Sequence, residues 1–166
     1  AGVQQDRAAS YYSNGAYKAV TRNVSGGWHD AGDLRKYMWM QANENWELMT
    51  AYEMYPNKFP DNWNIPESGN GIPDILDEEA FELKWMLRMQ SLSGASPAAG
   101  YGAVYSRNLD PNAGPEANDP STITNRRIYT EPTTWATAIF AAVMAQAARV
   151  YQPFTPALAA TYYAAA

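Results

Sequence analysis

The sequence predicts an all-α protein, and three observations support this fold class. Three segments carry apolar residues at steps of three and four, which is the spacing of one face of an α-helix. Proline residues stand at the boundaries of these segments. No stretch shows a convincing alternation of apolar and polar residues, so no strand is expected. With 166 residues, 46% of them hydrophobic, the chain is long enough to build a core.

The first predicted helix runs from Leu34 to about Tyr55. Before it, residues 1–33 are rich in Gly, Ser, Asn and Tyr without a sustained period, and they are expected to be mostly irregular. Pro56 and Pro60 close the helix. Its apolar stripe consists of Leu34, Met38, Ala42, Trp46 and Met49. Trp46 is expected in the core, as is Trp85 further along the chain.

The second predicted helix begins near Pro73, after the loop PDNWNIPESGNG at residues 60–71. Acidic residues in its first turns favour the positive end of the helix dipole: Asp74, Asp77, Glu78 and Glu79. Its largely apolar face consists of Ile72, Ile75, Leu76, Ala80, Leu83, Leu87 and Gln90.

A long connection rich in Gly, Pro, Asn and Ser follows, from Ser91 to about Glu131. Connections of this length are often functional when they are ordered. The third predicted helix comes after Pro132, and an Ala-rich segment beyond Pro156 ends the chain. The apolar face of the third helix consists of Trp135, Ile139, Val143, Ala147 and Val150.

Composition and charge exclude several classes of function. The formal net charge of −5 argues against an electrostatic grip on nucleic acid. No run approaches the roughly 20 apolar residues that span a bilayer, so no membrane partner is expected. The absence of Cys and the single His exclude thiolate and multi-histidine zinc sites. An aromatic content of 13% suits neutral ligands with flat apolar faces, such as sugars.

The stretch GGWHDAGD at residues 26–33 is the strongest candidate for chemistry. Asp30 and Asp33 are three residues apart, and a turn or first helical coil would bring both carboxylates into one space. A water held between them would become a good nucleophile, while Trp28 would offer a flat wall to a sugar ring and His29 a hydrogen-bonding group. A structural role is the alternative, with Asp33 as the N-cap of the following helix and Asp30 in an Asx turn. The spacing alone does not decide between these two interpretations.

The residues around this stretch resemble glycoside hydrolase family 9, the inverting β-glucanases. GGWHDAGD matches the family's signature block, and further blocks follow in the same order along the chain. They are NGIPDILDE (70–78) with ELKWMLRMQ (82–90), GAVY (102–105), and FAAVMAQAARVY (140–151) with Pro153 and Phe154. The resemblance implies an (α/α)6 barrel, of which residues 1–166 would be the N-terminal portion of a single catalytic domain, with about the first third to half of the helices.

The resemblance also implies a mechanism, the hydrolysis of β-1,4-glucosidic bonds in cellulose-like glucans with inversion. Asp33 matches the general base that activates water, and Asp30 matches the carboxylate that assists it. The general acid of the family is a Glu near the end of the catalytic domain, beyond the region matched here. An inverting enzyme needs that acid about 6.5–9.5 Å from the base. The fragment alone is therefore expected to be inactive, and its main partner is the remainder of the same domain. None of five glutamates that fall in other parts of the family pattern is expected to be the acid: Glu67, Glu78, Glu79, Glu82 and Glu131. Most of them are expected to be helix-start charges or solvated, whereas Glu131 lies in a loop that leads into a helix.

Two departures from the family pattern bear on the substrate. Ser106 and Arg107 stand where many members carry His-Lys, and Trp135 follows an unusual loop, YTEPTTW. Arg107 and Trp135 are therefore candidate substrate-binding residues, although Trp135 fits a buried helix face equally well. These departures leave open an exo-acting relative, of the glucosaminidase or cellobiohydrolase type, while the missing acid leaves open a non-catalytic sugar-binding remnant.

No cofactor is expected to be required. Calcium sites occur in the family, but the sequence shows no clustered ligand loop that supports one. The expected partner is a β-glucan or oligosaccharide, and a polymeric substrate favours a secreted or periplasmic location.

Overall fold

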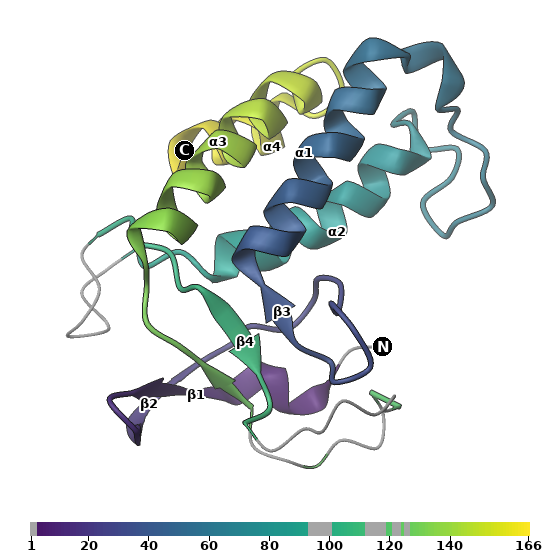
Figure 1. Cartoon of the computed structure of the whole chain (residues 1–166). Helices are drawn as coiled ribbons and strands as arrows, with labels where there is room; N and C mark the ends of the chain where they lie inside the picture. The colour runs from purple at the N-terminus through teal and green to yellow at the C-terminus, as the bar shows by residue number, and fades with distance from the viewer. Residues whose placement is uncertain (1–2, 93–100, 112–118, 121–123, 125–126) are drawn as a thin grey trace.

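The chain folds into helices on one side and a small mixed sheet at their end (Figure 1). The computed structural model describes residues 3–92, 101–111, 119–120, 124 and 127–166. In this part of the chain the helices are α1 (Met38–Met54), α2 (Asp74–Arg88), α3 (Thr134–Tyr151) and α4 (Pro156–Ala165), with short 3₁₀ helices η1 (Gln4–Ala8) and η2 (Pro56–Lys58). The strands are β1 (Ala9–Ser13), β2 (Ala16–Arg22), β3 (Lys36–Tyr37), β4 (Arg107–Leu109) and β5 (Ile128–Tyr129).

The helices pack around one apolar core. α1 contacts both α2 and α3, and α4 packs against α3 (Figure 1). The predicted stripes supply much of this core, because Met38, Ala42 and Met49 of α1 are fully buried. Trp85 is also fully buried, which confirms its prediction. Trp46 is 47% exposed, so its assignment to the core was wrong.

The prediction of an all-α protein is only partly confirmed, because the described residues also form a five-stranded mixed sheet in the order β2-β1-β5-β4-β3. β1 runs parallel to β5, and the other neighbouring strands are antiparallel. Most of the strands are too short to show an alternation of apolar and polar residues. Some of them pair with strands that are far away in the sequence, as Ser10 does with Ile128. One local signal was available, since Asn14 and Gly15 adopt positive φ between β1 and β2, as a two-residue hairpin turn requires.

Two further expectations are corrected by the structure. Residues 1–33 are not mostly irregular, because they contain η1, β1 and β2. The first helix begins at Met38 rather than Leu34, which has a left-handed φ of 57°. The long connection from Ser91 to Glu131 contains β4 and β5, and its residues 93–100, 112–118, 121–123 and 125–126 lie outside the described residues.

Helices α2 and α3 confirm the predictions that local pattern supports best. α2 begins directly after Pro73, and Thr133 caps α3 by accepting a hydrogen bond from the backbone N–H of Ala136. None of the described helices is both long enough and apolar enough to cross a membrane.

Candidate active site

The stretch GGWHDAGD forms the connection between β2 and β3, directly beside α2. Gly26 and Gly27 both have positive φ, which glycine adopts without strain. Gly27 also lies against α2, because a Cβ built on it would stand 2.8 Å from the Cβ of Trp85. The sequence therefore needs glycine here for two reasons, and the loop approaches the helix closely.

Trp28 is fixed by contacts from two helices. Its indole Nε1 donates to Glu78 of α2 at 2.7 Å, and its backbone N–H donates to the buried Glu82. Its carbonyl oxygen accepts a hydrogen bond of 3.1 Å from the side-chain amide of Gln41 in α1. The ring is thus held in one orientation beside the acidic turn.

The sequence suggested that the glutamates of α2 are helix-start charges or solvated, but two of them are buried. Glu79 and Glu82 are fully buried. Burial raises the pKa of Glu82 to about 8 and that of Glu79 to about 9. Glu82 is therefore largely protonated at neutral pH, and its role beside the acidic turn is to accept the Trp28 N–H.

Asp30 and Asp33 lie in a tight turn. The Asp30 N–H donates to the carbonyl of Arg35 at 2.8 Å, and the Leu34 N–H donates to the carbonyl of Ala31 at 2.9 Å. Asp30 is exposed, and the Asp33 side chain keeps 16% of its surface accessible. Both carboxylates can therefore meet water.

The capping interpretation of Asp33 is wrong. Helix α1 starts at Met38, its N-cap is Tyr37, and no side chain caps it. Asp33 instead accepts a hydrogen bond from the Arg35 N–H at 3.2 Å and forms an ion pair with the Arg35 Nε at 3.0 Å. Arg35 was not predicted, although a cation two residues after a candidate base was visible in the sequence. The guanidinium of Arg35 thus holds the Asp33 carboxylate in place within the turn.

His29 is half-buried, and it is neutral at physiological pH. Burial, followed by the nearby charges of Lys36 and Arg127, lowers the pKa of His29 to about 4. His29 and Trp28 both line a pocket of about 650 Å³ that also includes Arg88. Neither aspartate lines this pocket, so the structure places Trp28 and His29 together but does not add the acidic pair to the same cavity.

Trp135 lies in the first turn of α3 and is 54% exposed, which excludes the buried alternative. Its ring is 6.2 Å from the exposed ring of Trp39, edge to face, and both rings line a groove of about 380 Å³ with Asn43 and Glu44. Burial, followed by the charges of Asp30 and Glu47, raises the pKa of Glu44. Trp39 was missed because it falls beside the apolar stripe of α1 rather than on it.

Arg107 opens β4, and it is exposed. It is paired in the sheet with Tyr37, whose hydroxyl accepts a hydrogen bond of 3.3 Å from Arg35. Of the candidate substrate-binding residues, Arg107 is thus paired with the residue that precedes α1, and Trp135 contacts Trp39 in the first turn of α1.

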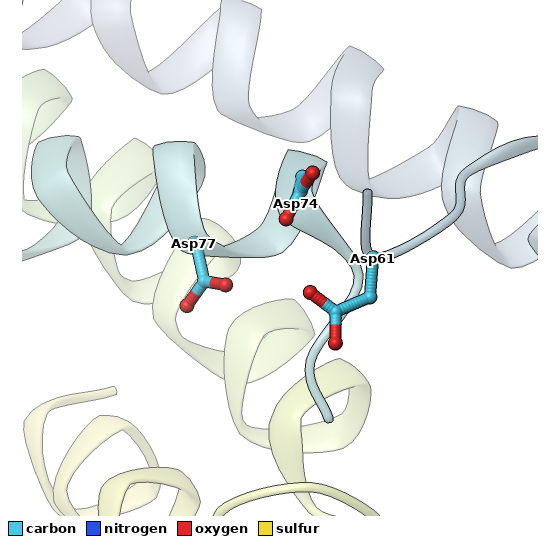
Figure 2. A group of neighbouring side chains, drawn as sticks. All are labelled: Asp61, Asp74 and Asp77. Atoms are coloured by element: carbon cyan, nitrogen blue, oxygen red, sulfur yellow. The ribbon is translucent and has the colours of Figure 1, made fainter. Parts of the chain in front are cut away.

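A second acidic group could hold a metal ion. Asp61, in the loop after η2, approaches Asp74 and Asp77 at the start of α2, and one oxygen of each lies within 4.8 Å of the others (Figure 2). Asp74 is fully buried, and its Oδ1 has no hydrogen-bond partner among the described residues. Carboxylate oxygens are the ligands that Ca²⁺ prefers. This group could not be recognised in the sequence, because a loop separates Asp61 from Asp74 and Asp77.

The sequence matches proteins of one enzyme family along its whole length. Residues 2–166 match the profile described as "Glycosyl hydrolase family 9". Endoglucanase D of Acetivibrio thermocellus is 34% identical over 146 residues, which cover 87% of this chain and 22% of that protein. A cellulose 1,4-beta-cellobiosidase of the same organism is 34% identical over 157 residues, which cover 90% of this chain and 17% of the cellobiosidase.

The fold agrees with the sequence match. The crystal structure of a metagenome-derived glycoside hydrolase family 9 endoglucanase superposes with a TM-score of 0.83 at 37% identity, covering 96% of this chain and 28% of that one. This chain therefore spans about a fifth of Endoglucanase D and corresponds to the N-terminal part of the catalytic domain. On these grounds the chain belongs to glycosyl hydrolase family 9.

Proposed function

We propose that the whole protein containing this chain hydrolyses β-1,4-glucosidic bonds in cellulose-like glucans with inversion, with Asp33 as the general base and Asp30 assisting it. The observation that carries this proposal is the state of Asp33, which caps no helix, keeps access to solvent and is paired with Arg35. The similarity to endoglucanases and to a cellobiosidase supports the reaction class.

The chemistry of the reaction follows from the charge on this turn. Asp33 takes a proton from a water molecule as the water attacks the anomeric carbon, and the ion pair with the Arg35 guanidinium orients the Asp33 carboxylate. The exposed Asp30 helps to hold the same water. A protonated carboxylic acid on the other side of the sugar must protonate the leaving oxygen, and we assign it to a Glu outside this chain. The fragment alone would then be inactive, and its partner is the remainder of the same catalytic domain.

The groove lined by Trp39 and Trp135 supports the choice of substrate. Exposed aromatic rings offer flat apolar faces to the C–H faces of sugar rings, and the charge of Asp30 acts on Glu44, which lines this groove. A glucan chain that lies over Trp135 and Trp39 would reach the acidic turn, with Arg107 and His29 as polar contacts. A polymer of this kind is degraded outside the cytoplasm, so we propose a secreted or periplasmic enzyme.

The test compares charge-neutral variants of the full-length protein on carboxymethylcellulose. Asp33→Asn is expected to lower kcat by at least about 100-fold, the lower end of a general base contribution, and Asp30→Asn to lower it less. Glu67→Gln, which removes one charge from an exposed loop, is the matched control and should retain activity. Unchanged hydrolysis by Asp33→Asn would overturn the assignment of the base. Glucan binding without hydrolysis by the wild-type protein would favour the non-catalytic sugar-binding role.

An exo-acting enzyme is the second candidate, because a cellobiosidase is among the similar proteins. Ser106 and Arg107, together with the loop before Trp135, are the features that distinguish it. Product analysis separates the two candidates, since an endo-acting enzyme releases a range of oligosaccharides early and an exo-acting one releases a single short product. Hydrolysis of chitosan oligomers without hydrolysis of carboxymethylcellulose would indicate a glucosaminidase and exclude an endoglucanase.

A further inference from the structure

Three charged side chains that the proposed mechanism does not use are buried beneath the acidic turn. Asp6 in η1, Lys36 in β3 and Arg127 just before β5 are each at most 1% exposed. The Lys36 Nζ is 2.7 Å from one carboxylate oxygen of Asp6, and the Arg127 Nε is 2.8 Å from the other. One carboxylate therefore joins two cations that come from distant parts of the chain.

Both cations also donate hydrogen bonds to the backbone of the signature loop. The Lys36 Nζ donates to the carbonyl of Gly26 at 2.7 Å, at the start of GGWHDAGD. The Arg127 Nη2 donates to the carbonyl of Leu34 at 2.5 Å, directly after Asp33. The two ends of the loop that carries the proposed base are thus tied to one another through Asp6.

Each cation has a further partner that restricts its movement. Lys36 donates a second hydrogen bond to the carbonyl of Val24 at 3.2 Å, and Arg127 donates to the side-chain oxygen of Asn108 at 3.0 Å. Buried ion networks add little net stability, because desolvation offsets much of their attraction. They do hold the atoms they bind in place, because loss of one partner leaves a buried charge unpaired.

We propose that Asp6, Lys36 and Arg127 are positioning residues for catalysis, which hold residues 26–34 so that Asp33 points its carboxylate at the attacking water. This inference rests on the proposed role of Asp33. The three residues touch no substrate, and they act through the loop alone. A shift of about 1 Å in a catalytic group can cost about 100-fold in rate, so a small relaxation of the loop is enough to be measured.

The test uses substitutions that keep the charges and change the geometry, so that Asp6 stays paired. In the full-length protein, Arg127→Lys removes the guanidinium group that reaches Leu34, and Lys36→Arg alters the contact with Gly26. Each is expected to lower kcat about 10- to 100-fold and to leave KM within about twofold, because the loss occurs in the transition state. Arg149→Lys is the matched control, since Arg149 pairs with Glu53 in an exposed ion pair, and its kcat should not change.

A double-mutant cycle with Asp33→Asn separates positioning from general structural damage, with a fluorogenic aryl cellobioside as a sensitive substrate. If Arg127 acts through Asp33, Arg127→Lys should cost less than about twofold when Asp33 is already Asn. An equal loss in both backgrounds would overturn the positioning role while leaving the base assignment intact. Wild-type kcat in both single variants, or failure of both to fold, would also overturn it. Full activity of Asp33→Asn alone would instead refute the proposed function, and with it this inference.

Discussion

Replacing Gly27 by Ala perturbs the contact between the signature loop and helix α2. Gly27 has a φ of 72°, and an added Cβ would stand 2.8 Å from the Cβ and Cγ of Trp85 and from the Oε2 of Glu82. Trp85 is fully buried and is attached to the helix at the clashing atom, so it cannot move aside. The added methyl group must therefore displace the loop.

The size of the effect can be separated into two parts. The left-handed conformation costs an Ala residue about 1–2 kcal/mol. Overpacking of a close contact adds about 1–3 kcal/mol. Gly15→Ala is a matched control, because Gly15 has a φ of 73° with nothing within 4 Å of its Cβ position. We expect a loss of about 1–2 kcal/mol for Gly15→Ala and about 2–5 kcal/mol for Gly27→Ala.

The assay is denaturant-induced unfolding of the full-length protein, combined with the rate of glucan hydrolysis. Gly27→Ala should also lower kcat, because displacement of the loop breaks the hydrogen bond from the Trp28 N–H to Glu82 and moves the turn that carries Asp33. Gly15→Ala should leave kcat unchanged. Equal destabilisation by the two substitutions would refute the claim that the loop presses against α2.

Three further predictions follow from the described residues. Glu79→Gln should raise the Tm at pH 8 relative to the wild type and leave it unchanged near pH 4.5. The pKa of Glu79 is about 9 in the folded protein and 4.5 in the unfolded chain, so the wild type loses up to about 1.4 kcal/mol of stability per pH unit as the pH rises between these values. A difference in Tm between the two proteins that does not change with pH would contradict the burial of an ionisable group. Trp39→Ala and Trp135→Ala should each raise KM for glucan several-fold with little change in kcat, whereas Tyr163→Ala, an exposed aromatic on α4, should change neither. Ca²⁺ should stabilise the protein by about 2.7 kcal/mol at 100 times its Kd, and EDTA should reverse this gain. If Ca²⁺ stabilised Asp74→Asn as much as the wild type, the cluster of Asp61, Asp74 and Asp77 would be excluded as the Ca²⁺ site.

Much of the helical part of the fold could be predicted from the sequence. The apolar stripes of α2 and α3 and the proline and threonine residues at their starts are local signals, and both helices form where these signals stand. The stripe of the first helix predicted its buried face but not its start. Leu34 fits the helical spacing, yet the chain at this point is needed for the acidic turn and for the pairing of β3 with β4.

The candidate site residues could be proposed from the sequence, but the contacts that hold them in place could not. Asp30, Asp33, Trp28 and His29 are consecutive or nearly so, and their pattern could be read directly. Arg35 holds Asp33, and Glu82 holds Trp28, through contacts that depend on how the loop meets its neighbours. The exposure of Trp135 was also undecided until α3 was placed against α1.

The sequence by itself determined the apolar periodicity, the helix boundaries marked by proline and threonine, and the resemblance to an enzyme family, because each of these is a property of neighbouring residues. The tertiary structure decided the sheet, the buried ion network and the group of three aspartates. Ser10 pairs with Ile128, and Asp6 pairs with Arg127, across more than a hundred intervening residues. No local pattern encodes such a pairing, because the burial that makes it necessary exists only after distant segments have packed together.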